Sequence, residues 1–171
     1  MEIYSKNIKH GYLENAFGFL GTQFTKENKP NRSFHIAWDN LPKKTKSLVL
    51  TFIDYDAVPV CGFPWIHWTV SNINPLLLEL PEDASEKMNL LEGITSWFSP
   101  LLPTEIKLDK EQAIGYGGCA PPDKPHQYTL TVYALNTKLS LNKGFYLNEL
   151  LKAMEDHILD HSLIHAIYKN K

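Results

Sequence analysis

Aspartates and histidines stand at the ends of three apolar segments. Asp54 and Asp56 follow SLVLTFI, His67 lies near the start of IHWTVSN, and His126 comes two residues before YTLTVYAL. Carboxylates commonly orient imidazoles, and a charged imidazole donates strong hydrogen bonds to anionic oxygens. If the segments are neighbouring strands, Asp54 and both imidazoles converge at one sheet edge, where the two histidines donate N–H groups to an anion. For either histidine alone, a structural role beside an apolar strand is the competing interpretation.

A stiff loop, GYGGCAPPDKP, leads into His126. Glycines such as Gly118 allow close backbone approach, and successive N–H groups in such a turn can form a nest for an anion. Pro121 and Pro122 fix the exit of the loop. We therefore expect a rigid rim whose N–H groups at residues 118–120 point inward, with a tight surface turn as the alternative.

Four segments have the composition of β-strands, at residues 34–38, 47–53, 66–72 and 128–135. The last three are apolar at both odd and even positions, which is typical of strands covered on both faces. The sequence therefore predicts a central sheet with material packed on each side. Because side chains alternate along a strand, Trp65 should share a face with His67, and Tyr128 with His126.

One helix is predicted near the C-terminus, with a short final strand at residues 162–169. An apolar stripe at helical spacing comprises Leu147, Leu150, Leu151, Met154 and Ile158. Asn142 is a plausible cap before it. Residues 1–30 show no clear period, and residues 76–111 are expected to be largely irregular, with one helical turn.

Length and composition bound the class of protein. A chain of 171 residues suits a single domain over residues 1–171, and 43% hydrophobic residues are enough for a core. A net charge of −2 without long basic runs argues against a nucleic-acid partner. The sequence has neither a transmembrane stretch nor a signal-peptide core, so a cytoplasmic location is expected. There, Cys61 and Cys119 should be free thiols.

The three motifs together resemble the phosphatidylethanolamine-binding protein family, most of all its bacterial and archaeal Raf kinase inhibitor-like members. The similarity is carried by SLVLTFIDYDA, WIHWTVSNI and GYGG…PPDKPHQYTLTVYAL and spans residues 30–168. It implies a mostly β, sandwich-like fold with a large antiparallel central sheet, a smaller sheet and flanking helices, including one at the C-terminus. It also implies a cavity near the sheet end that binds phosphate or a phosphoryl head group, without a cofactor.

The resemblance assigns candidate ligand-binding residues, which are Asp54, Asp56, Trp65, His67, Tyr116, Gly118, Pro121, Pro122, His126 and Tyr128. Several positions depart from the family pattern, among them Tyr55, Gln127 and Ala120. Tyr55 replaces the proline of Asp-Pro-Asp, Gln127 replaces the arginine of His-Arg-Tyr, and Ala120 stands where eukaryotic members have glycine. The departures put in question the stiffness of the first turn, a charged contact and the closeness of the loop to the ligand.

Other classes of function remain open. Cys119 lies seven residues before His126, so a hydrolase or transferase with a thiol nucleophile is one alternative. A protein-interaction module that inhibits a kinase or protease, as other family members do, is another. Two histidines and an aspartate would suit zinc, but no motif of metal-ligand spacing supports a metal site. Trp97 and Phe98 could form a homodimer contact or a buried local cluster.

Overall fold

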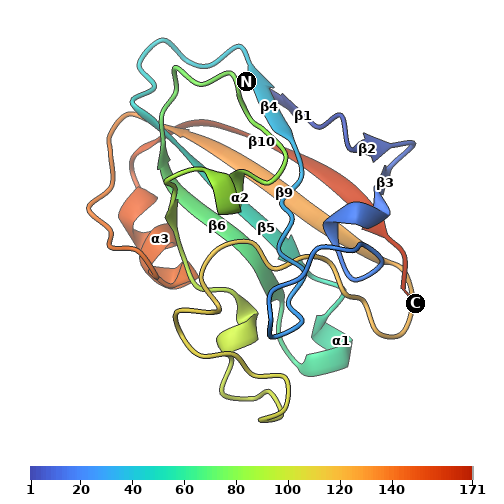
Figure 1. The fold of residues 1–171 in the computed structure, drawn as a ribbon. Helices are drawn as coiled ribbons and strands as arrows, with labels where there is room; N and C mark the ends of the chain where they lie inside the picture. Colours follow the sequence, from blue (N-terminus) through green and yellow to red (C-terminus); the bar gives the residue numbers. More distant parts are fainter. Residues whose placement is uncertain (171) are drawn as a thin grey trace.

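The computed structural model describes residues 1–170 and is built around a seven-stranded sheet (Figure 1). In spatial order its strands are β2 (Ile8–Lys9), β3 (Tyr12–Leu13), β10 (Ile158–Tyr168), β9 (His126–Leu135), β5 (Ser47–Asp54), β6 (Trp65–Ile73) and β8 (Leu91–Glu92). All neighbouring strands run antiparallel except β3 and β10. The predicted large antiparallel sheet is confirmed.

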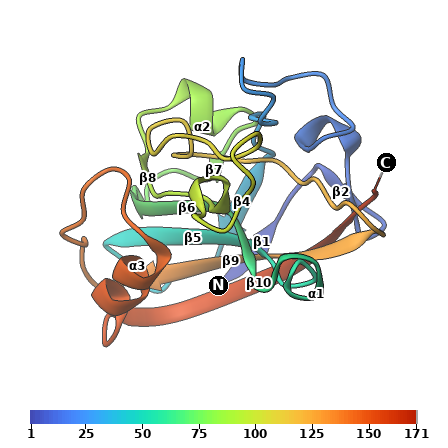
Figure 2. The ribbon, with the colours of Figure 1, turned by 90° about the horizontal axis from the view of Figure 1, so that it is seen from below.

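A second, three-stranded sheet completes the sandwich. It consists of β1 (Glu2–Tyr4), β4 (Ile36–Asp39) and β7 (Glu79–Leu80), in the order β1-β4-β7. Seen from below, β4 and β7 lie with the short helix α2 (Ala84–Lys87) on one side of the strands β5, β9 and β10 (Figure 2). The main core fills the space between these layers with large side chains such as Phe34, Phe52 and Trp68.

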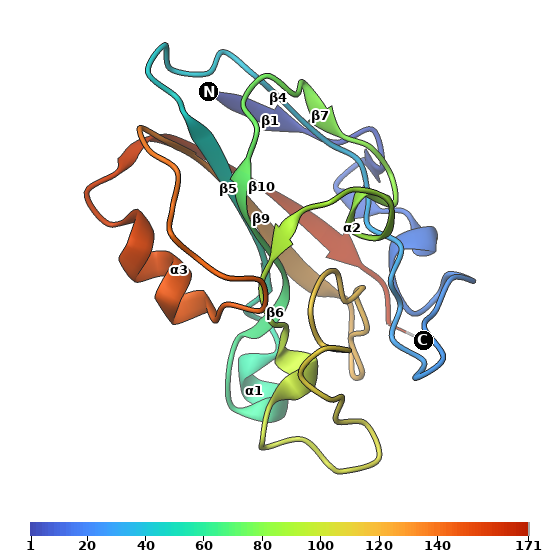
Figure 3. The same cartoon turned by 60° about the vertical axis from the view of Figure 1, so that its left-hand side comes forward.

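Strand β5 is buried along its whole length, as its apolar sequence on both parities predicts. One face contributes Leu50 and Phe52 to the main core. The other face contributes Val49 to a second cluster, which also contains Leu150 and Met154 of helix α3 (Leu147–Met154). The predicted packing on both faces of the central strands is therefore confirmed, and α3 covers part of the second face (Figure 3).

Helix α3 is shorter than the apolar stripe suggested. It ends at Met154, because Glu155 is extended and Asp156 has a φ of 64°, so the inclusion of Ile158 in the helix was wrong. Ile158 instead begins β10, an 11-residue strand that pairs along its length with β9, and so the final strand is not short. Tyr146, not Asn142, occupies the N-cap, where its N–H donates to Glu149 Oε2 at 2.7 Å.

Short elements and loops gather at one end of the large sheet. Helix α1 (Val58–Cys61) and the 3-10 turn η2 (Ser96–Phe98) lie there in two views (Figures 1 and 3). A further 3-10 turn, η1 (Asn15–Phe17), belongs to the N-terminal segment. Within residues 1–170 no helix has the length and apolar character needed to cross a membrane.

Candidate functional site

The end of the sheet beside α1 holds the candidate residues, because three strands begin or end there. Strand β5 ends at Asp54, which is paired with Tyr128 of β9 on one side and with Trp65 of β6 on the other. Strand β9 begins at His126, two residues before Tyr128. Antiparallel pairing thus brings the end of one strand against the beginnings of its two neighbours, as the sequence predicted.

A β-bulge on β6 determines where His67 points. The pairing of β5 with β6 shifts by one residue, from Phe52 opposite Trp68 to Ile53 opposite Ile66. Bulges re-aim side chains that would otherwise alternate. The His67 ring consequently lies 5.8 Å from the Phe52 ring and 5.1 Å from the Tyr128 ring, measured between centroids. His67 therefore joins the same face as the core aromatic residues.

His126 lies between two carboxylates. Its Nδ1–H donates to Asp54 Oδ2 at 2.7 Å, and its Nε2–H donates to Asp123 Oδ1 at 2.8 Å. Burial opposes protonation of the imidazole, but the hydrogen bonds to Asp54 and Asp123 outweigh it, so the pKa of His126 is raised. A carboxylate oxygen at each ring nitrogen favours the doubly protonated imidazolium form of His126.

Asp54 also holds the turn in which Tyr55 replaces the family proline. Its Oδ1 accepts the N–H of Ala57 at 3.2 Å, just before α1 begins. A side-chain oxygen that accepts a backbone N–H two or three residues ahead fixes a turn without proline. The carboxylate is almost fully buried, so its two oxygens are committed to Ala57 and His126.

His67 has the opposite electrostatic character. Its Nδ1 lies 2.6 Å from the carbonyl oxygen of Gly117, and since a carbonyl only accepts, Nδ1 carries the hydrogen. Burial lowers the pKa of His67, which favours the neutral ring. In that tautomer Nε2 bears a lone pair, so it accepts a hydrogen bond. This geometry favours His67 as an acceptor, and donation from both imidazoles to a ligand stays a prediction.

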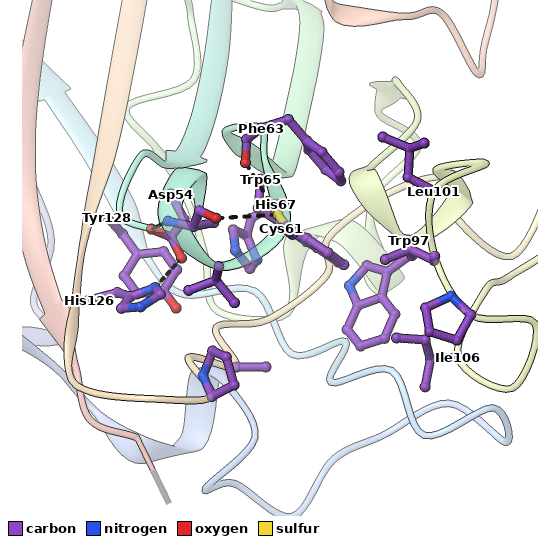
Figure 4. Close-up of a pocket in the computed structure, with 16 residues that line it drawn as sticks. Asp54, Cys61, Phe63, Trp65, His67, Trp97, Leu101, Ile106, His126 and Tyr128 are labelled. Carbon is purple, nitrogen blue, oxygen red and sulfur yellow. Dashed lines mark hydrogen bonds and ion pairs between the residues drawn. The ribbon is translucent and has the colours of Figure 1, made fainter.

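These groups border a cavity of about 460 Å³. Six of the ten candidate residues line it: Asp54, Trp65, His67, Pro122, His126 and Tyr128. Figure 4 shows Asp54, His126 and Tyr128 at one side, with Trp97, Leu101 and Ile106 at the other. The cavity thus has a polar end at the sheet and an apolar end formed by the segment that follows η2.

The other four candidates lie outside this lining. Asp56 accepts the N–H of Gln127 at 2.9 Å, which ties the turn to β9 from the exposed side. Tyr116 is buried in the core and donates its hydroxyl to Phe17 O at 2.7 Å.

Pro121 borders a smaller hollow. Gly118 donates its N–H to Pro30 O at 2.8 Å, and a Cβ at this position would lie 2.8 Å from Pro30 Cβ. The Gly118 N–H expected to face an anion is instead used within the protein, and the glycine permits close packing against the N-terminal segment.

Several lining residues were not singled out as ligand-binding from the sequence, among them Val60, Cys61, Phe63, Leu101 and Ile106. They come from α1 and from irregular segments, which have no period to mark them. Their apolar composition could have indicated them, because apolar side chains in an irregular segment usually pack against another part of the protein or line a cavity. Asp123 was also missed, although a carboxylate three residues before His126 is close in sequence.

The two cysteines differ sharply. Cys119 is fully buried and does not line the cavity, and burial raises the pKa of its thiol well above the usual range. A thiol that stays protonated and enclosed is a poor nucleophile. Cys61 is only partly buried and lines the cavity. The pairing of Cys119 with His126 as a catalytic unit thus gains no support from the geometry.

Two further sequence hypotheses concern this region. Over residues 1–170, no group of three or more His, Cys, Asp or Glu side chains is arranged to hold a metal ion. Trp97 and Phe98 are half-buried and pack against a local cluster of Ile94, Leu108 and Ala113. The local cluster is therefore formed, and the homodimer stays a prediction.

Comparisons with known proteins place this geometry in context. Residues 10–169 match the sequence pattern of the phosphatidylethanolamine-binding protein family. YxkA of Bacillus subtilis is 45% identical over 159 residues, which cover 91% of this chain and 93% of YxkA. YbhB of Escherichia coli is 33% identical over 139 residues, which cover 80% of this chain and 76% of YbhB.

Two crystal structures share the whole fold. CT736 of Chlamydia trachomatis, described as a homologue of phosphatidylethanolamine-binding protein, matches with a TM-score of 0.79 at 26% identity, covering 99% of this chain and 97% of that one. YbcL of Escherichia coli, described as a member of the same family, matches with a TM-score of 0.75 at 27% identity, covering 99% and 98%.

Proposed function

Because this chain belongs to the phosphatidylethanolamine-binding protein family, we propose that its cavity binds a small ligand with an anionic phosphoryl head group. The observation that carries the proposal is the buried pair of Asp54 and His126 at the polar end of the cavity. Asp54 holds the His126 ring at this end of the cavity, where an oxyanion could accept its Nε2–H in place of Asp123. The family description supplies the chemical class of the ligand, a phosphoryl head group.

The two histidines together suit a phosphoryl monoanion. A phosphate monoester loses its second proton at a pKa of about 6, so below that pH it is a monoanion whose single negative charge is shared by two oxygens beside one P–OH group. An anionic oxygen can accept from His126, while the P–OH donates to Nε2 of the neutral His67. One charge-assisted hydrogen bond contributes roughly 1.5–3 kcal/mol, which fits modest affinity.

The apolar end supports a ligand with more than a head group. A volume of about 460 Å³ lies within the usual range for small-molecule sites and exceeds what inorganic phosphate needs. Trp65 and Trp97 meet edge to face there, with ring centroids 5.6 Å apart. We therefore expect an apolar or aromatic substituent to increase affinity over the head group alone.

Histidine NMR shifts during titration with inorganic phosphate and O-phosphoethanolamine test the proposal. The wild type is compared with His126→Gln and His67→Gln, with His10→Gln as the matched control on an exposed turn outside the cavity. We expect the His126 and His67 signals to move in the wild type and the control, and each cavity variant to lose affinity. If neither signal moves while the fold is intact, the proposal fails, and a protein partner becomes the better explanation.

The cytoplasmic location stays a prediction.

A further inference from the structure

We propose that Asp123 is an internal competitor for the ligand, whose carboxylate holds the position from which an anion would accept the Nε2–H of His126. The inference rests on the proposed function and specifies how that site selects its ligand. In the structure, His126 Nε2–H donates a 2.8 Å hydrogen bond to Asp123 Oδ1.

That contact leaves His126 without a free donor. An imidazolium has two N–H groups, and here Nδ1–H donates to Asp54 while Nε2–H donates to Asp123. The His126 side chain is 1% exposed, so no other part of it is open to a polar ligand. An anionic ligand can therefore hydrogen-bond to His126 only by replacing one of the two carboxylates.

The two carboxylates differ in how easily they can be replaced. Asp54 is buried, and its second oxygen holds the turn at Ala57, so its departure would leave an unpaired charge and an open turn. Asp123 is 48% exposed and lies in the loop between Pro122 and Pro125, where its carboxylate is hydrogen-bonded to His126 and to backbone N–H groups of its own loop. Water can solvate its carboxylate once it turns outward. Asp54 is thus the fixed partner of His126, and Asp123 the displaceable one.

Displacement makes the site selective. A simple carboxylate ligand would replace Asp123 with an equivalent group and gain no additional polar contact. A phosphoryl monoanion replaces it and can also donate its P–OH to Nε2 of His67, the ring nitrogen that does not face Gly117 O. Asp123 should therefore exclude acetate-like anions while still allowing the phosphoryl group to bind.

The variant Asp123→Ala tests this proposal with inorganic phosphate and acetate as the probes. Glu105→Ala is the matched control, because it removes an exposed carboxylate between the cavity-lining residues Pro103 and Ile106 without touching His126. Asp123→Asn keeps the side-chain size without the charge and covers the case in which the alanine variant misfolds. Affinities are measured by calorimetry and by the His126 ring signals.

We expect phosphate to bind Asp123→Ala about tenfold more tightly than wild type. In wild type, binding breaks the charge-assisted hydrogen bond between His126 and Asp123, and the variant does not have that bond to lose. Asp123→Asn should lie between the two, and Glu105→Ala should stay within about twofold of wild type, as for an exposed charge. Acetate should move the His126 signals only in the Asp123 variants. The gain should persist at about 0.5 M salt, where a long-range charge effect is screened.

Three results would overturn the proposal. If wild type binds phosphate and the Asp123 variants bind it no more tightly, Asp123 does not compete, although the proposed function stands. If Glu105→Ala gives the same gain as Asp123→Ala, the effect is general electrostatics. If neither wild type nor any variant binds phosphate, the proposed function fails and the competitor role fails with it.

Discussion

Replacing Asp54 with asparagine isolates the charge of the central pair. The substitution keeps the size of the side chain, and the amide oxygen can still accept the N–H of Ala57. The amide nitrogen then faces Nδ1 of His126 in place of Oδ2, so the imidazole can no longer donate there. The pKa of His126 should fall, because Asp54, the stronger of the two carboxylates that favour protonation, has lost its charge while burial still opposes protonation.

The cost follows from the loss of one buried, charge-assisted hydrogen bond, roughly 1.5–3 kcal/mol. In a domain of this size that corresponds to a fall in Tm of about 3–12 °C. The sign of the pH dependence is fixed by the raised pKa of His126. Its contribution to stability is complete below the usual histidine pKa and is lost as pH rises through the raised value in the folded protein. Asp54→Asn should therefore be most destabilising in mild acid.

Urea unfolding at two pH values, one on each side of the His126 titration, measures this effect, with the titration itself followed by NMR. Asp56→Asn is the matched control, since it makes the same chemical change two residues away, at a partly exposed carboxylate that accepts the N–H of Gln127 and does not contact His126 in the hydrogen bonds of residues 1–170. Its cost should stay within about 0.5 kcal/mol. Equal stability of the two variants at both pH values, with an unchanged His126 titration, would refute the assignment of Asp54 as the residue that charges His126.

Three other perturbations give distinct readouts. Because burial lowers the pKa of His67, the folded state resists its protonation, so stability should fall as pH drops below the usual value of about 6.5, and His67→Gln should flatten that loss in acid unfolding curves. Iodoacetamide should modify Cys61 well before Cys119 in the native protein, and faster loss of Cys119 by mass spectrometry would contradict its burial. Gly18→Ala should lower the free energy of unfolding by about 1–3 kcal/mol, since its Cβ would lie 2.6 Å from Tyr168 Cζ and would also clash with Cys119 O. An unchanged midpoint of urea unfolding would show that this contact can relax.

The sequence predicted the strands that are buried on both faces, because their composition leaves no other placement. Strands β5, β6 and β9 are of this kind, and their adjacency brought Asp54 to His126. Strand β10 was underestimated, since exposed polar residues such as His161 and His165 interrupt its pattern on one face. The two-residue strands β7 and β8 have no period to detect.

The details of the site depend on partners that are distant in sequence. Gly118 has a hydrogen-bond acceptor at Pro30, and His67 has one at Gly117, and neither pairing leaves a trace in local spacing. The bulge at His67 likewise arises from strand pairing. Residue types alone therefore predicted which groups converge, but not that one imidazole faces a backbone carbonyl while the other lies between two carboxylates.

Crystals soaked in arsenate, a heavier isostere of phosphate, would test the central proposal most directly through the anomalous signal of arsenic. The account predicts an arsenic peak at the polar end of the cavity, with an oxygen within hydrogen-bond distance of His126 Nε2 and another near His67 Nε2, and with the Asp123 carboxylate turned away. Arsenic peaks confined to surface lysines, with Asp123 still bonded to His126, would contradict it.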